Sequence, residues 1–298
     1  MSDLERGVLM FAYNNEKLSY DRLATICALT VKANLKNNNT TLLTDGATYK
    51  ALQDTCPKEI REYAFDQIIV EDIRHEKNMR VHHDSIDVEF ATQFSNANKH
   101  NVFNLSPYQQ SLLLDVDYLL GSDRLDMLFE TDYELALFRN AHGLRNNQPH
   151  SDEQRLHPLG IDMWWSTVIY WRKTDYSKKF FNMWHHVKEN YDYYRFLYKF
   201  PGNMFRTDYA SSIAIHILNG QVDNTLTNNI PPGSMRYMDQ LDDLVEVNGK
   251  NNMLFLANLL SDKKKNILTR IKNEDVHMMN KMAMLRHYNT FLNKYYYD

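Results

Sequence analysis

Cysteine is scarce in this chain, because Cys27 and Cys56 are the only two thiols among 298 residues. Two cysteines cannot build the disulfide framework of a small secreted domain, so we expect a protein of a reducing compartment. The sequence also lacks a run of about 20 apolar residues, which a membrane-spanning helix needs. Its first six residues have none of the features of a signal peptide. These absences predict a cytoplasmic protein with no membrane span.

An excess of positive charge is missing too. The 34 Lys and Arg residues stand against 38 Asp and Glu residues, a formal net charge of -4, so no overall field attracts nucleic acid or an anionic membrane. The hydrophobic content of 43% and the charged content of 24% are typical of a globular protein. The abundance of Asn, Lys and Tyr favours an AT-rich source such as a viral genome, in which case the compartment is the host cytoplasm.

The first 70 residues alternate between strand and helix patterns. Apolar residues 7–13 predict a strand, residues 19–35 an amphipathic helix, and residues 40–44 a second strand. A further helix near residues 47–56 and a strand at residues 67–71 extend the series. Alternation of this kind predicts an α/β fold whose mostly parallel central sheet is flanked by helices.

A short apolar run at residues 112–114 is followed directly by Asp115 and Asp117. The run is typical of a strand buried on both faces of a parallel sheet, and ligands of such sheets bind at the carboxyl ends of the strands. Two acids one residue apart point to the same side and can share a divalent cation. An isolated Asp-x-Asp more often begins a polar loop, but the buried strand favours the cation because buried carboxylates need compensating charge.

The segment from Ser106 to Asp117, Ser-Pro-Tyr-x-x-(Ser/Thr)-Leu-x-Leu-Asp-x-Asp, resembles the metal-site segment of GT-A glycosyltransferases, which are related to glycogenin and the bacterial galactosyltransferases. The resemblance implies a single Rossmann-like GT-A domain over residues 1–298, with a nucleotide-sugar-binding half at 1–140. Residues 141–298 would form a less regular acceptor-binding half and a closing helix. It further implies a UDP-sugar donor, Mn²⁺ or Mg²⁺ as cofactor, and hexosyl or pentosyl transfer to a hydroxyl acceptor, with retention of configuration favoured over inversion.

The same resemblance assigns donor contacts before the acidic pair. Ala12, Tyr13 and Asn14 follow the first strand and would contact the base and ribose, although a strand end with a polar turn explains them equally well. Lys99 is the basic residue that would meet the donor ahead of the Asp-x-Asp strand.

A late segment would complete the site. His277 would be the third metal ligand, and Lys281 would contact the pyrophosphate. The family pattern His-x-x-Gly-x-x-Lys is changed here, because Asn280 replaces Gly and the Lys follows sooner. A histidine on a helix surface is an equally good explanation of His277 by itself.

Asp208 begins a helical apolar stripe within residues 205–218. In the family an acid at this helix start faces the acceptor or the anomeric carbon, where it would act as a base or stabilise a sugar cation. A carboxylate favoured by the helix dipole is the alternative explanation. Upstream, the family commonly has Asn where this chain has Ser166 and Thr167, and at most one of the adjacent Trp164 and Trp165 can face the site.

Other segments lead to expectations without a family role. Residues 72–85 contain three histidines without a zinc spacing and are expected to form a solvated loop, followed by a short helix at residues 86–94. Residues 141–160 are expected to form a loop that serves as a lid or is a surface insertion. A basic cluster in a helix or turn would contact DNA if the acceptor were a hydroxylated base, and would otherwise be a solvated surface. The cluster consists of Lys263, Lys264, Lys265, Arg270 and Lys272.

Two other functions remain open at this point. A sugar nucleotidyltransferase would carry a Gly-rich phosphate loop after the first strand, whereas this chain has Ala-Tyr-Asn-Asn-Glu there. A catalytically inactive module would keep the fold without turnover, and the intact acidic pair argues against it.

Overall fold

The computed structural model describes residues 4–36, 38–71, 78–84, 86–94, 96–145, 155–156, 160–200, 204–222, 226–231, 234–259 and 262–298. Structural statements below refer to these residues. Among them, no helix combines the length and apolar character needed to cross a membrane.

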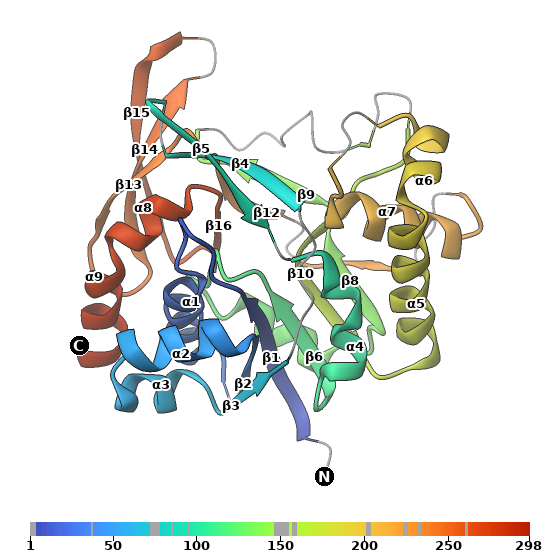
Figure 1. Ribbon diagram of the computed structural model, residues 1–298, viewed down its shortest axis with the longest axis horizontal. Coiled ribbons are helices and arrows are strands. Elements are labelled where there is room, and N and C mark those ends of the chain that lie inside the picture. Colours follow the sequence, from blue (N-terminus) through green and yellow to red (C-terminus); the bar gives the residue numbers. More distant parts are fainter. Residues whose placement is uncertain are drawn as a thin grey trace.

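A seven-stranded sheet forms the centre of the molecule, in the order β11-β8-β10-β6-β1-β2-β3 (Figure 1). Its strands are β1 (Leu4–Ala12), β2 (Asn39–Thr44), β3 (Gln67–Val70), β6 (Tyr108–Leu114), β8 (Leu135–Phe138), β10 (Trp165–Arg172) and β11 (Asn228–Asn229). β1 pairs in parallel with β2 and β6, and β2 pairs in parallel with β3. β10 runs antiparallel to both of its neighbours, β6 and β8. The predicted α/β class with a mostly parallel sheet flanked by helices is confirmed.

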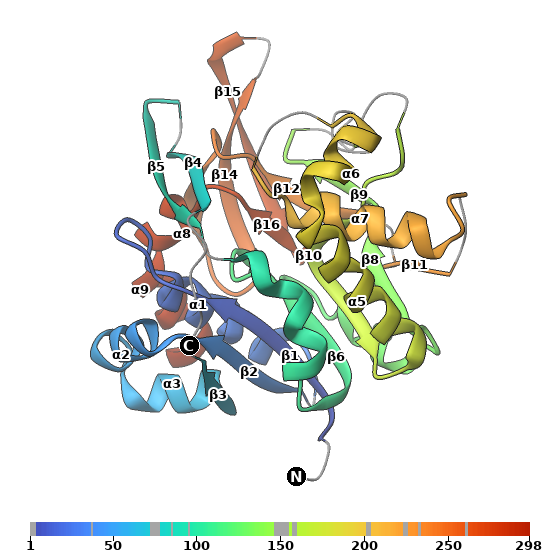
Figure 2. The same cartoon turned by 45° about the vertical axis from the view of Figure 1, so that its right-hand side comes forward.

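Helices cover the sheet in two groups, one at the β1–β3 end and one at the β8–β10 end (Figures 1 and 2). The first group contains α1 (Tyr20–Asn34), α2 (Gly46–Thr55), α3 (Lys58–Ala64), α8 (Lys281–Arg286) and α9 (Tyr288–Leu292), and a π-helical turn (Asn293–Tyr297) ends the chain. The second contains α5 (Asp175–Glu189), α6 (Tyr191–Tyr198) and α7 (Thr207–Leu218). Between α3 and α5 in the chain lie the short helix α4 (Val102–Leu105) and two 3₁₀ segments (Asn96–Asn101, Arg124–Glu130). Helix α1 is buried at eleven of its positions because the other helices of its group pack around it.

A smaller four-stranded sheet, β7-β16-β12-β9, brings distant parts of the chain together. Its strands are β7 (Tyr118–Leu119), β9 (Asn140–Gly143), β12 (Ser234–Met238) and β16 (Val276–Met278). Because β16 pairs with β7, residue 277 lies opposite residue 118. This pairing carries a C-terminal segment to the end of β6.

Two segments differ from the sequence predictions. Residues 86–94, predicted as a helix, contain the strand β5 (Val88–Phe94), which pairs with β4 (Asn78–Asp84) in an antiparallel hairpin. Among the described side chains of β4 only His82 is buried, and it stacks on Phe90 instead of lying in a solvated loop. Burial, with Lys281 and Arg80 nearby, lowers the pKa of His82 to about 3.

The basic cluster also differs, because residues 262–272 form a strand, β15 (Asp262–Lys272), and neither a helix nor a turn. β15 belongs to a three-stranded sheet with β13 (Asp243–Val247) and β14 (Asn252–Leu259). The side chains of Lys263, Lys264 and Lys265 lie outside the described residues, as does most of the predicted 141–160 loop. Arg270 forms an ion pair with Glu246 at 3.9 Å, so an acidic side chain lies next to this member of the basic cluster.

Candidate functional site

A pocket of about 420 Å³ opens where β1 and β6 end, the position at which ligands of α/β sheets bind. Its walls come from the ends of both strands, the β4 strand, the start of α7 and the segment around β16. The polar residues that line it are Tyr13, Tyr20, Arg80, Lys99, Asp115, Asp117, Thr167, Arg206, Thr207, Asp208, Tyr237, Gln240, His277 and Lys281. Most of the residues predicted from sequence therefore meet in one cavity.

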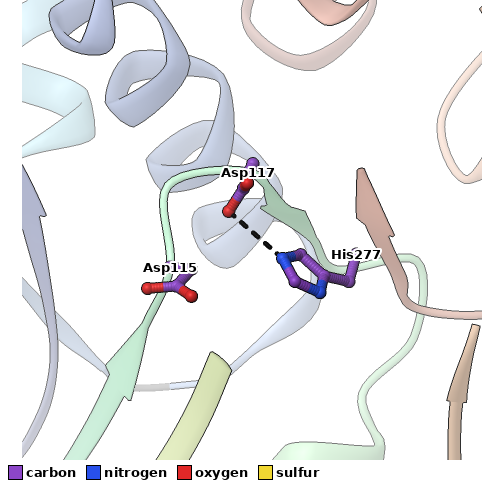
Figure 3. Close-up of side chains that lie close together, drawn as sticks. All are labelled: Asp115, Asp117 and His277. Atoms are coloured by element: carbon purple, nitrogen blue, oxygen red, sulfur yellow. Dashed lines mark ion pairs between the residues drawn. The ribbon is translucent and has the colours of Figure 1, made fainter. Parts of the chain in front are cut away.

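Asp115, Asp117 and His277 form a compact cluster in this pocket. One ligand atom of each lies within 4.8 Å of the others, and His277 Nε2 is 3.5 Å from Asp117 Oδ1 (Figure 3). Two carboxylates and one imidazole form a set of hard oxygen ligands with a single nitrogen, which suits Mg²⁺ or Mn²⁺ better than a structural zinc. The residues present therefore fit a divalent cation.

Backbone hydrogen bonds hold the cluster in place. The Asp115 N–H donates to the Thr167 carbonyl at 2.9 Å, and the Tyr118 N–H donates to the Asp115 carbonyl at 2.9 Å, which closes a tight turn after β6. The Met278 N–H donates to the Asp117 carbonyl at 2.7 Å. The turn presents both carboxylates, and β16 adds the imidazole from the far end of the chain.

Two buried lysines compensate the acidic charge. Lys99 forms an ion pair with Asp115 and Lys281 forms one with Asp117, and each lysine side chain is at most 5% exposed. Burial alone would raise the pKa of Asp117, but Lys281 and His277 outweigh it and hold this pKa well below its ordinary value. For Asp115, burial outweighs the attraction of Lys99 and raises the pKa.

Asp208 is rigidly held across the pocket. Its Oδ1 accepts hydrogen bonds from the Ser166 N–H at 2.8 Å and the Ser166 hydroxyl at 2.7 Å, and Arg206 lies 3.7 Å from its Oδ2. Burial raises the pKa of Asp208, yet Arg206 and the two Ser166 bonds outweigh burial, so the pKa is lowered. The carboxylate is therefore ionised at neutral pH. Ser166 stands where the resemblance led us to expect Asn, and its role here is to hold Asp208.

The residues predicted to bind the nucleoside divide into two groups. Tyr13 lines the pocket. Ala12 and Asn14 are not among the described lining residues: the Ala12 carbonyl accepts from Thr44 Oγ1, and Asn14 Oδ1 accepts from the Asp21 N–H. In this geometry Ala12 and Asn14 shape the turn after β1.

The adjacent tryptophans face different surroundings, as alternation along a strand requires. Trp165 lines the pocket, and its ring centroid lies 6.3 Å from that of His277. Trp164 packs away from the pocket under the Arg139 guanidinium, 5.4 Å from the ring centroid.

Several pocket residues have no role in the sequence predictions, among them Tyr20, Arg80, Arg206 and Tyr237. Tyr20 was assigned to the apolar stripe of the first helix, and its hydroxyl is buried without a hydrogen-bond partner. Arg80 lay in a segment predicted as a solvated loop. The sequence signal for these residues is weak, because Tyr20 begins α1 and Arg80 lies on β4, and only the folded chain brings these two elements to the cavity.

No family model and no curated protein sequence matches the chain. The solved structures that resemble it include several glycosyltransferases. They include GlyE of Streptococcus pneumoniae TIGR4 (12% identity, TM-score 0.40, covering 78% of this chain and 45% of GlyE) and the galactosyltransferase LgtC (13%, 0.42, 78% and 73%). Mouse xyloside xylosyltransferase 1 is a third (11%, 0.41, 76% and 85%).

The chain thus spans less than half the length of GlyE.

Proposed function

We propose that this protein is a cation-dependent glycosyltransferase that moves a sugar from a nucleoside diphosphate sugar, with a UDP-sugar as the first candidate, to a hydroxyl group. The observation that carries the proposal is the cluster of Asp115, Asp117 and His277 beside two buried lysines. The same cavity holds a third carboxylate, that of Asp208, apart from the cluster. A diphosphate leaving group needs concentrated positive charge, and a sugar with cationic character needs a nearby anion.

Asp115, Asp117 and His277 would hold Mn²⁺ or Mg²⁺, and the bound cation would neutralise negative charge on the departing diphosphate. Lys281 is held by Asp117 at the edge of the cluster. A phosphate oxygen that entered here would offer Lys281 a second, charge-assisted partner. Lys99 occupies the corresponding position beside Asp115, between that carboxylate and the Ser166 carbonyl, 3.2 Å away.

Asp208 is better suited to stabilise positive charge than to remove a proton. A general base works best with a pKa near the operating pH, whereas Ser166 and Arg206 lower the pKa of Asp208. A fixed, ionised carboxylate opposite the cation cluster is suited to a sugar that gains positive charge. This supports the retaining reaction over an inverting one in which Asp208 deprotonates the acceptor.

Tyr13 and Tyr20 offer aromatic surface at the β1 side of the pocket, where the nucleoside would bind. The acceptor remains open. A DNA acceptor would require a basic surface that continues from the pocket, and none of residues 263–272 is among the described lining residues. A glycan, protein or small-molecule hydroxyl is therefore the first choice for acceptor screens.

A donor screen without acceptor provides the test. Purified protein is incubated with a panel of nucleotide sugars and Mn²⁺, and slow hydrolysis of the donor is followed by chromatography. We expect hydrolysis of one donor that EDTA abolishes and that Asp115→Asn and Asp208→Asn each reduce by at least about 100-fold. Lys58→Ala, on the far surface of α3, is the control and should keep wild-type hydrolysis. Hydrolysis that persists in EDTA, or survives in Asp115→Asn, would contradict the proposal. Formation of sugar 1-phosphate together with the nucleoside triphosphate when pyrophosphate is added would instead favour a nucleotidyltransferase.

A further inference from the structure

Besides Asp117, the imidazole of His277 is surrounded by three residues outside the proposed set of cation ligands. Thr167 Oγ1 lies 3.3 Å from its Nδ1, and both side chains are buried. The rings of Trp165 and Tyr237 meet the imidazole edge to face, with centroids 6.3 and 5.9 Å away. The two aromatic rings limit rotation of the imidazole, and the threonine hydroxyl meets one nitrogen while the other points to Asp117 (Figure 3).

A neutral imidazole carries one proton, and its position decides whether the ring can bind a cation. With the proton on Nε2, the ring would donate to Asp117 Oδ1, 3.5 Å away, and its one lone pair, on Nδ1, would face Thr167 and not the cluster. With the proton on Nδ1, the lone pair of Nε2 faces Asp117 and the cluster. The second tautomer needs an acceptor at Nδ1, because a buried N–H without a hydrogen-bond partner carries a desolvation penalty.

We infer that Thr167 is a positioning residue for the cation site: its hydroxyl accepts the Nδ1–H of His277 and so leaves Nε2 free to bind the ion. The inference rests on the proposed cation dependence of the transfer reaction. A hydroxyl is suited to this position because it accepts a hydrogen bond without adding a charge to an already crowded site. Histidines that bind metals generally donate their other ring N–H in this way, and loss of that partner weakens metal binding by about 10- to 100-fold.

Thr167 also connects the two halves of the cluster. Its carbonyl accepts from the Asp115 N–H at 2.9 Å while its hydroxyl meets His277. One residue of β10 thus sets the position of Asp115 through the backbone and the position of His277 through the side chain. A side-chain substitution should disturb only the second function, since the backbone bond does not depend on residue type.

The test uses Thr167→Val, which keeps the shape but cannot accept a hydrogen bond, and Thr167→Ser, which restores the hydroxyl. Mn²⁺ alone is titrated into each protein and followed by electron paramagnetic resonance. The tautomer of His277 is measured from its ¹⁵N shifts with and without Mg²⁺. We expect the His277 ring of the wild-type protein to carry its proton on Nδ1. Thr167→Val should bind Mn²⁺ at least about 10-fold more weakly and should shift His277 toward the Nε2–H tautomer. Thr167→Ser should recover most of the Mn²⁺ affinity and of the wild-type tautomer.

Thr41→Val is the matched control. It also removes a buried threonine hydroxyl, which is bonded to Tyr108 in the sheet interior, away from the pocket. It should lower stability without changing Mn²⁺ affinity or the His277 tautomer. Equal Mn²⁺ affinity and an unchanged tautomer in Thr167→Val would overturn the inference even if the wild type binds Mn²⁺. Failure of the wild type to bind Mn²⁺ would instead overturn the proposed cation dependence, and with it the basis of the inference.

Discussion

Removal of one member of the buried Asp117–Lys281 pair should destabilise the fold. Asp117 is 4% exposed and Lys281 is 5% exposed, so Asp117→Ala leaves an ammonium group in the interior without its counter-charge. Loss of one partner from a buried pair costs about 3–5 kcal/mol. Against a total stability of about 5–15 kcal/mol for a typical domain, this is a large fraction.

The comparison with a double variant isolates the charge effect. Asp117→Ala combined with Lys281→Met removes both charges and keeps most of the apolar stem of the lysine, and replacement of a buried pair by apolar groups is often close to neutral. We therefore expect the double variant to recover most of the stability that Asp117→Ala loses, while both proteins lack cation binding.

The assay is unfolding by urea at pH 7 in EDTA, so that no bound cation contributes to the free energy of unfolding. Glu62→Ala is the control, because it breaks the exposed pair with Lys58 and should cause no measurable change. The reasoning is refuted if Asp117→Ala is as stable as wild type, or if Lys281→Met does nothing to restore it.

Three further predictions concern packing, pH and substrate binding. Gly121→Ala should destabilise the protein by about 3 kcal/mol in thermal unfolding, because the added Cβ would lie 2.1 Å from the Glu274 carbonyl oxygen. Gly46→Ala is the control: its Cβ meets no atom within 4 Å, so this change should be neutral or stabilising. Burial, only partly offset by hydrogen bonds from the Asn258 and Asp239 N–H groups, raises the pKa of Asp242 to about 6. The contribution of Asp242 to stability is therefore greatest below pH 4 and falls by about 3 kcal/mol as the pH rises through 6. It is measured as the difference in unfolding free energy between wild type and Asp242→Asn across this pH range. A difference that does not change with pH would contradict the raised pKa. Tyr20→Phe should leave stability unchanged or slightly higher, because it removes a buried hydroxyl with no partner. If that hydroxyl contacts a bound nucleotide, calorimetry with UDP and Mn²⁺ will show weaker binding than in Tyr288→Phe, whose ring lies outside the pocket.

Local patterns in the sequence were enough to predict the strand and helix order at the start of the chain and the acidic pair at the end of β6. An unbroken apolar run before two acids is a short-range signal, because burial on both sheet faces and the sudden need for charge compensation occur within a few residues. This signal was sufficient to place Asp115 and Asp117 together at the end of a buried strand, and the alternation of strands and helices was sufficient to predict the fold class. The assignment of Lys99 and Lys281 depended instead on a family resemblance, and the structure places both in buried ion pairs with these acids.

The remaining features depended on long-range pairing. Residues 86–94 are an exception, because they have no helix-breaking residue but pair locally: β4 ends at Asp84 and β5 begins at Val88, and this hairpin places Arg80 at the pocket. Thr167 was noted only together with Ser166, at the position where the family commonly has Asn. Its hydroxyl gains a role beside His277 only because β16 pairs with β7 and carries His277 to within 3.3 Å. Separations of this length leave no periodicity in the sequence, since sheet register between distant segments is decided by which surfaces can be buried together.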